Sequence, residues 1–528
     1  MTAIITEKFR QHNATQFFES FSEASATVYY LMIGKSMPFT SGTSGGSDDS
    51  PPTPADDISS EFYTWDSSIA AKKITTSNIT KVVPRRDWAN STIFDMYEDN
   101  ISASNTTTSG ATNLFDSTFY FKTSDNRVYM VLDNNAGVAY SGAEPTSEST
   151  SSFVLGGYTL KYLYTISASQ QATFMTTDFM PVSTDSTVSA AATDGAIESI
   201  IVTNTGSGLT NGTYYAAVYG DGTSQGTSSG AIVKITVSSN AISAVSTGNT
   251  GVYQAGAGYT FGTVNLGSGF TFSDTSLSSA SAIGGSGSAI SVVISPKGGH
   301  GSDNAAQLGG HYVMLQTSLE GADNDDFLTG NDFRNINLVA DPTTFGTSTV
   351  GTATSYRVTY AMQFSGTPGT FQADEKISQA TTGAIGRVVE FDSTLNILYY
   401  QQEKFADYGT NSSTGAYVAF STDATVTGAT SGATGVPDAT SDSAVTLAGG
   451  NTITFSDGYA NPELQPDSGN IIYREQRKPI ARATDQTEDI KVIVLPPDNV
   501  TAESADESGV PVAPEVAPVM VAVVLNAI

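Results

Sequence analysis

Three short motifs bring together residue types that do chemistry in other proteins. Gly34-Lys35-Ser36 looks like the end of a phosphate-binding loop, but that loop needs another glycine five residues before Gly34, where Tyr29 stands. The segments 42–46 and 226–230 both fit the G-x-S-x-G pattern of a hydrolase nucleophile. Neither lies between a predicted strand and a predicted helix, and a chain with 50 glycines produces such matches by chance. We therefore expect no phosphate site, no catalytic serine and no enzymatic activity.

Two histidines and an acidic loop are the candidates for a metal site. His300 and His311 stand eleven residues apart beside glycines, so their imidazoles are able to share a transition metal. Because no helical spacing or carboxylate motif accompanies them, turn histidines that hydrogen-bond the backbone are the preferred interpretation. Segment 321–332 holds four aspartates, but Leu328 stands where a calcium-binding EF-hand loop needs glycine. We predict a solvated acidic loop there, and no metal or cofactor.

The segment Pro84-Arg85-Arg86-Asp87-Trp88 is unusual in so acidic a chain. Arginine and tryptophan anchor many protein interfaces, which favours a hydrogen-bonded corner or a contact for a protein partner. The alternative is an internal salt bridge that holds the second predicted helix against a strand. We single out these five residues as candidates for a structural or partner contact.

Composition excludes several classes of function. The chain has 528 residues, 23 Lys+Arg and 52 Asp+Glu, which gives a net charge of −29. Such a chain repels nucleic acid and anionic membrane surfaces. It has no cysteine, so disulfides and thiolate zinc sites are excluded, and its longest apolar run, 519–525, is too short to cross a membrane. Only 14% of residues are charged, and serine, threonine, asparagine and glycine take their place, as in β-rich extracellular or virion proteins.

The spacing of apolar residues predicts a mainly β chain with a few short helices. The first helix is expected to be capped by Asn13, and a second to carry Ile58, Phe62, Trp65 and Ile69 on one face. Strands are predicted over Ala26–Ile33, Phe119–Phe121, Val128–Leu132 and Tyr158–Ile166, the middle two as a hairpin.

Internal similarity begins near residue 195. Ala196–Ile200 returns as Ala241–Val245, and Gly230–Ile235 is echoed by Ser288–Val293. We interpret these segments as two copies of a small β unit in which glycines supply the turns.

A second pair of similar segments lies later in the chain. Ile377–Gly386 matches Val426–Gly435, and two copies are too few for a solenoid. They are expected to be inserted β-hairpin modules, with a disordered linker over Ser421–Ser443 as the alternative. The last ten residues are apolar and should dock on the chain's own body or on a neighbour.

Short segments along the whole chain resemble one protein family. The most specific are Val83–Trp88, Ile472–Ile480 and Asp485–Ile490. Weaker matches occur in the same order at Ala3–Arg10, Gly34–Phe39, Pro51–Pro54, Trp65, Val128–Tyr129, Leu132–Asp133, Tyr162–Leu163 and Phe333–Ile336. Together they resemble the dimer-forming baseplate wedge subunit of T-even-type contractile-tailed bacteriophages.

The resemblance implies a multi-layer β-sandwich core with a few short helices, no catalysis, and a homodimer that links neighbouring wedge proteins during assembly and tail contraction. It also implies contacts with other wedge and peripheral baseplate proteins, and a place in the virion tail baseplate after assembly in the host cytoplasm. Nucleic-acid binding and membrane insertion are not expected. The Gly/Ser/Thr-rich repeats are expected as β insertions in that core. The predicted domains are 1–194 (core), 195–325 (inserted module), 326–360 (core), 361–450 (second inserted module), 451–495 (core strands) and 496–528 (C-terminal arm).

Two other functions stay open from the sequence. The Gly/Ser/Thr-rich repeats suit a receptor-binding or adhesive tail protein that recognises cell-surface glycan. A polysaccharide depolymerase needs two carboxylates at a fixed separation. With 52 acidic residues, no such pair is identifiable from the sequence.

Overall fold

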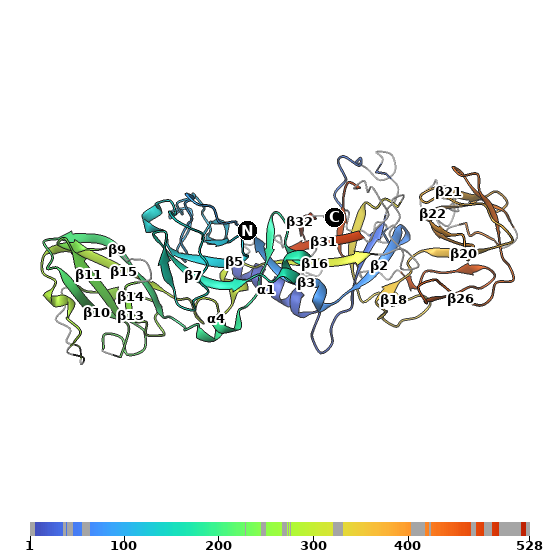
Figure 1. Ribbon diagram of the computed structural model, residues 1–528. Coiled ribbons are helices and arrows are strands. Elements are labelled where there is room, and N and C mark those ends of the chain that lie inside the picture. Colours follow the sequence, from blue (N-terminus) through green and yellow to red (C-terminus); the bar gives the residue numbers. More distant parts are fainter. Residues whose placement is uncertain are drawn as a thin grey trace, which may run out of the picture. The chain divides into compact units, whose positions relative to one another are not determined.

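The computed structural model divides the chain into two compact units, residues 1–80 with 312–528 (unit 1) and residues 81–311 (unit 2) (Figure 1). The fold is mainly β with a few short helices, as predicted. The structure describes residues 6–34, 38–39, 46–54, 64–227, 229–243, 250–266, 272, 274, 276–319, 331–402, 418–421, 424–465, 471–479, 488–495 and 519–523. Within these residues no helix is long and apolar enough to span a bilayer.

Unit 1 is built on an antiparallel sheet whose described strands follow the order β19-β2-β1-β17-β30. Their bounds are β1 Tyr29–Gly34, β2 Ser68–Ile74, β17 Asn335–Ala340, β19 Ser355–Tyr356 and β30 Ile471–Gln476. Every residue of β1 is buried, because its alternating side chains enter two different cores. Leu31 and Ile33 join one apolar cluster, and Tyr30 and Met32 join another with Trp65.

A second sheet covers the Leu31 side of the first. Strand β16 (Tyr312–Leu319) pairs with β31 (Glu488–Leu495), which pairs with β32 (Val519–Val523). Side chains of β16 and β31, such as Leu315 and Val492, share the apolar cluster of Leu31. The two sheets therefore form a sandwich, and the pairing of β32 docks part of the apolar tail on the chain itself.

Both predicted N-terminal helices differ from the prediction in extent. Helix α1 spans Glu7–Glu19 and is capped by Thr6, whose hydroxyl accepts the N–H of Phe9, so the predicted cap Asn13 is wrong and lies inside the helix. In the second predicted helix, only Thr64–Asp66 is helical among the described residues, and Ile58 and Phe62 lie outside them. Ile69 belongs to strand β2, where it is buried in the sandwich.

Unit 1 also contains a closed six-stranded barrel formed by β20 to β25, in which β20 pairs with β23 to close the ring. The matching repeats form its two hairpins, β21–β22 and β24–β25, so Ser421–Ser443 is ordered where the structure describes it. Val389, Ile397 and Tyr399 of the barrel belong to the apolar cluster of the sandwich. The bounds are β20 Tyr360–Ser365, β21 Lys376–Gln379, β22 Ala384–Asp392, β23 Ile397–Gln401, β24 Val426–Gly428, β25 Thr434–Pro437, and outside the ring β18 Thr343–Thr344, β26 Ala444–Thr446, β27 Thr452–Thr454, β28 Tyr459–Ala460 and β29 Leu464–Gln465.

Unit 2 begins with an aromatic sheet of order β4-β5-β7-β6. The predicted hairpin is confirmed as β4 with β5, and the predicted strand after it as β7. The bounds are β3 Ile79–Pro84, β4 Tyr120–Lys122, β5 Arg127–Asp133, β6 Phe153–Leu155, β7 Tyr158–Thr165, β8 Phe179–Pro181, α3 Ala168–Phe174, α4 Ser186–Ala191 and α5 Asn304–Gln307. Short 3₁₀ turns are η1 Thr76–Asn78, η2 Leu114–Asp116, η3 Asn135–Gly137 and η4 Ala280–Ala282.

The first pair of repeats forms one β module in unit 2, built around a shared apolar core (Figure 1). The repeated segments pair across copies: β9 pairs with β15, and β11 pairs with β12. The bounds are β9 Ile197–Ser207, β10 Gly212–Gly220, β11 Ile232–Ser238, β12 Ala241–Ile242, β13 Val252–Gln254, β14 Gly262–Val264 and β15 Ser286–Ile294.

Candidate protein-interaction site

The backbone of the Pro84–Trp88 segment is fixed by strand β4. The hydroxyl of Tyr120 donates to the carbonyl of Pro84 (2.7 Å). The N–H of Lys122 donates to the carbonyl of Arg86 (2.7 Å), and the N–H of Trp88 donates to the carbonyl of Lys122 (2.8 Å). The segment thus follows directly on β3, and its residue Asp87 forms a parallel β-bridge with Lys122 of β4.

An ion network stabilises this corner. The guanidinium of Arg85 contacts the carboxylate of Asp87 (3.0 Å) and donates to the carbonyl of Thr176 (2.9 Å). Lys122, almost fully buried, lies 3.3 Å from the same carboxylate. Burial alone would raise the pKa of Asp87, but hydrogen bonds from Arg85 and the positive charges of Lys122 and Arg85 hold it below its usual value. Asp87 is therefore ionised at neutral pH.

Arg86 is also engaged inside unit 2. Its guanidinium lies 4.5 Å from the centre of the Tyr120 ring and donates to the carbonyl of Phe115 (3.0 Å). The cationic groups of both arginines thus contact strands and loops of their own unit. The ion pair of Arg85 and Asp87 is thus internal to unit 2, and the described contacts join the segment to β4, to the 3₁₀ turn η2 and to the turn before β8.

The tryptophan of the segment borders an exposed apolar patch. Trp88 packs edge to face against Tyr140 (5.8 Å between ring centres). The backbone of Tyr140 exchanges hydrogen bonds with Ser91 and Thr92, so the loop that holds Ile93 lies beside the loop that holds Val138. Ile93 is 44% exposed and Val138 is 56% exposed. We call Trp88, Ile93 and Val138 the Trp88 patch.

Sequence reasoning found Trp88 but missed the other two members of the patch. Ile93 and Val138 stand as single apolar residues in polar loops, and such residues are common on protein surfaces. The pairing of their two loops beside Tyr140, on which Trp88 packs, is visible only in the structure.

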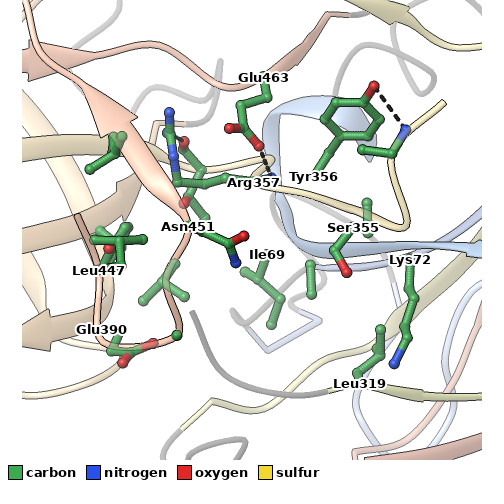
Figure 2. A pocket seen from close by; sticks show the side chains of 18 of the residues that line it. Ile69, Lys72, Leu319, Ser355, Tyr356, Arg357, Glu390, Leu447, Asn451 and Glu463 are labelled. Atoms are coloured by element: carbon green, nitrogen blue, oxygen red, sulfur yellow. Dashed lines mark hydrogen bonds between the residues drawn. The ribbon is translucent and has the colours of Figure 1, made fainter. Parts of the chain in front are cut away.

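Unit 1 contains a cavity of about 740 Å³ (Figure 2). Strand β2, the segment 353–357, the barrel and the β26–β27 hairpin line it, with Lys72, Arg357, Glu390 and Glu463 as its charged side chains. Figure 2 shows Glu463 beside Arg357, whose backbone N–H donates to that carboxylate (2.7 Å).

The cations of this cavity are used to join segments of unit 1. Lys72 donates to the carbonyl of Ser318 (2.6 Å), and Arg357 donates to the carbonyls of Thr359 and Asn461. Burial lowers the pKa of Arg357. Both cationic side chains of the cavity are therefore used to hold segments of unit 1 together. Among the described lining residues, no two side chains are arranged as nucleophile and base.

The residues considered for metal binding are dispersed. The Nδ1 atom of His311 contacts the carbonyl of Gly309 (2.9 Å), as predicted for a turn histidine. His300 is fully buried edge to face on Tyr97 (5.1 Å between ring centres), and burial lowers its pKa to about 4. Of the acidic loop only residues 331 and 332 are described, and Asp332 contacts Arg334 (3.4 Å). Ser228 and residues 42–45 of the G-x-S-x-G motifs lie outside the described residues. Within the described part of the chain, no three His, Cys, Asp or Glu residues are grouped to hold a metal.

Comparison with known proteins gives one family. Residues 3–133, about a quarter of the chain, match the family described as Bacteriophage T4, Gp8. This segment contains the whole Pro84–Trp88 corner, strand β4 and Ile93. No curated protein matches the chain closely enough to count as a relative. The match confirms the resemblance predicted from the sequence: residues 3–133 are similar to the T4 baseplate wedge protein family, which supports a T4-like baseplate wedge subunit.

Proposed function

We propose that the protein is a structural subunit of the baseplate wedge that forms a homodimer, links neighbouring wedge proteins and keeps them connected when the tail contracts. The family match supports this role most directly. We also propose that the subunit is assembled into wedges in the host cytoplasm. On this proposal the modules 195–325 and 361–450 are insertions in the family core, and 496–528 is an arm.

The contact surface that we propose is the Trp88 patch. Both arginines of the corner are engaged with their own unit, so their role is to fix the backbone that presents Trp88. Trp88 is half-buried on the apolar cluster of Tyr140, and a fixed tryptophan with exposed aliphatic residues on neighbouring loops is typical of the anchor of a protein interface. Because this anchor lies within or next to the family-matched segment, a wedge protein or a second copy of the chain is the partner that fits it.

Substitution of the two exposed members of the patch tests this surface. Ile93→Glu and Val138→Glu place a charge on the patch without disturbing a buried side chain, so folding should be retained. We expect at least a tenfold loss of homodimer in light scattering, or of incorporation into wedges, because a charge desolvated at an interface is costly.

Phe345→Glu is the matched control, because Phe345 is 45% exposed in unit 1 and lies outside the patch. It should dimerise and assemble like the wild type. If both patch variants dimerise and assemble as well as the wild type, the proposed surface is contradicted. The role as a wedge subunit is tested independently, by asking whether purified baseplates contain the protein.

A further inference from the structure

The repeat module of unit 2 has a surface unlike that of the rest of the chain. Of residues 195–294 only four are charged, namely Glu198, Asp221, Lys234 and Asp274. In a chain of net charge −29, this stretch of 100 residues carries a net charge of −2. Its polar groups are instead hydroxyls and amides, which exchange hydrogen bonds with a neutral partner without desolvating an ion.

Four aromatic side chains stand on the face of this module's sheet that is opposite its apolar core, and two of them, Tyr253 and Phe261, are exposed. On β10, Tyr214 enters the core, so Tyr215 points to the opposite face. The ring of Tyr253 from β13 lies edge to face on that of Tyr215, 5.0 Å between ring centres, and Tyr253 is 49% exposed. Tyr219, two alternations further along β10, is half-buried on the same face. Between them Ala217 is 2% exposed, and the buried ring of Phe272 lies 6.4 Å from that of Tyr215, so the face is partly covered there.

A further ring extends this row at the end of β10. Gly220 of β10 pairs with Gly262 of β14. Gly262 faces the core, because a Cβ added to it would meet the side chain of Val218. The preceding residue, Phe261, therefore points to the opposite face, next to Asp221. The N–H of Phe261 donates to the carboxylate of Asp221 (3.2 Å), and the ring is 60% exposed. At 3.3 Å per residue, the row from Tyr215 to Phe261 is about 20 Å long.

We infer that this aromatic strip, Tyr253, Tyr215, Tyr219 and Phe261, binds an uncharged polysaccharide chain. A sugar ring presents apolar C–H groups on its faces and hydroxyls on its edge. The exposed rings of Tyr253 and Phe261 match the faces, and the hydroxyl-rich surface matches the edges. The near absence of charge argues against a strongly ionic partner, and the length of the row fits an extended chain better than a single sugar. The inference is independent of the wedge role.

Binding of purified full-length protein to immobilised polysaccharides tests this site. The panel contains a neutral glucan, a mannan and a galactan, with polygalacturonate as the anionic member. The wild type should bind at least one neutral polysaccharide. Tyr253→Ala and Phe261→Ala should each weaken that binding at least tenfold, whereas Phe345→Ala, which removes an exposed ring elsewhere, should not change it.

Three outcomes would overturn the inference. They are no binding to any neutral member, preferential binding to polygalacturonate, and unchanged binding by both strip variants. Thermal unfolding of each variant separates a lost ligand contact from a lost fold, because rings this exposed contribute little to the core. Incorporation of the strip variants into baseplates should stay at the wild-type level, so failure here is distinguishable from failure of the wedge role.

Discussion

The two repeat-bearing regions of the molecule use internal similarity in opposite ways. In the barrel each copy is a local hairpin: Gln379 pairs with Ala384 in the first, and Thr427 with Thr434 in the second. In the module of unit 2 the two copies pair with each other: Ile197, in the first copy, lies opposite Ile294, which directly follows the second copy. Repeated sequence therefore specifies strands in both regions, but it specifies the pairing only where the turn is short.

The barrel hairpins show how a near-identical turn is held by two different side chains. Gly383 and Gly432 take positive φ at equivalent places, and the hydroxyls of Thr382 and Ser431 accept equivalent N–H groups. The first hydroxyl is held by the amide of Gln379, and the second by the carboxylate of Glu375. Gly428 stands where a side chain would displace that carboxylate.

The largest expected effect comes from the shared core of the unit 2 module. Tyr259 is buried, its ring fills the space beside three glycines, and its hydroxyl accepts the N–H of Ala231. Tyr259→Ala should cost about 3–5 kcal/mol of stability, as for other buried aromatic truncations. Because pairing crosses the copies, hydrogen exchange should accelerate in β9, β11 and β15 together. Acceleration confined to one copy would contradict the shared fold.

The next effect should separate the two barrel hairpins. The buried Glu375 carboxylate accepts hydrogen bonds from the N–H groups of Gln372, Thr430 and Ser431 and from the hydroxyl of Ser431. Glu375→Ala should cost about 3 kcal/mol, because hydrogen bonds to a charge are strong and four donors lose their acceptor. Hydrogen exchange should rise at the β24–β25 turn and much less at β21–β22.

Gln379→Ala is the matched variant for the first hairpin. Its neutral amide bonds Thr382, Ser421 and Ala424, so we expect a loss of about 1–2 kcal/mol centred on β21–β22. Equal losses for both variants would mean that the charge on Glu375 adds nothing.

The last of these effects is a pH dependence that separates the units. Burial lowers the pKa of His300 in unit 2 to about 4 from an ordinary 6.5. The neutral imidazole is thus favoured by folding, so its stabilisation is complete above pH 6.5 and is lost as the pH falls toward 4. At pH 5 the loss is about 2 kcal/mol by linkage. His300→Gln should remove this dependence of exchange in unit 2, and an unchanged dependence would show that other groups cause it.

The sequence was sufficient where local signals agree with tertiary structure. The β4–β5 hairpin and β1 follow from aliphatic and aromatic runs bounded by polar turns. The second helix was misjudged at Ile69, because a residue spaced for a helix face is equally suited to a buried strand. The cap of α1 was placed at Asn13 because apolar spacing starts there, whereas the helix begins about two turns earlier, on mostly polar residues capped by Thr6.

The candidate site was predictable only in part. Paired arginine, aspartate and tryptophan marked the corner, but the contact of Asp87 with Lys122 depends on a strand more than thirty residues away. Ile93 and Val138 join Trp88 through loop pairing, for which no periodic pattern exists. The aromatic strip likewise depends on the alternation of β10 and on the register of β14.

The most direct test of the central assignment is quantitative mass spectrometry of purified tails or baseplates. A baseplate wedge subunit must be present at a fixed ratio to the other baseplate proteins, and that ratio should persist after repeated purification. Absence from the particle, or an amount that varies freely between preparations, would contradict the assignment.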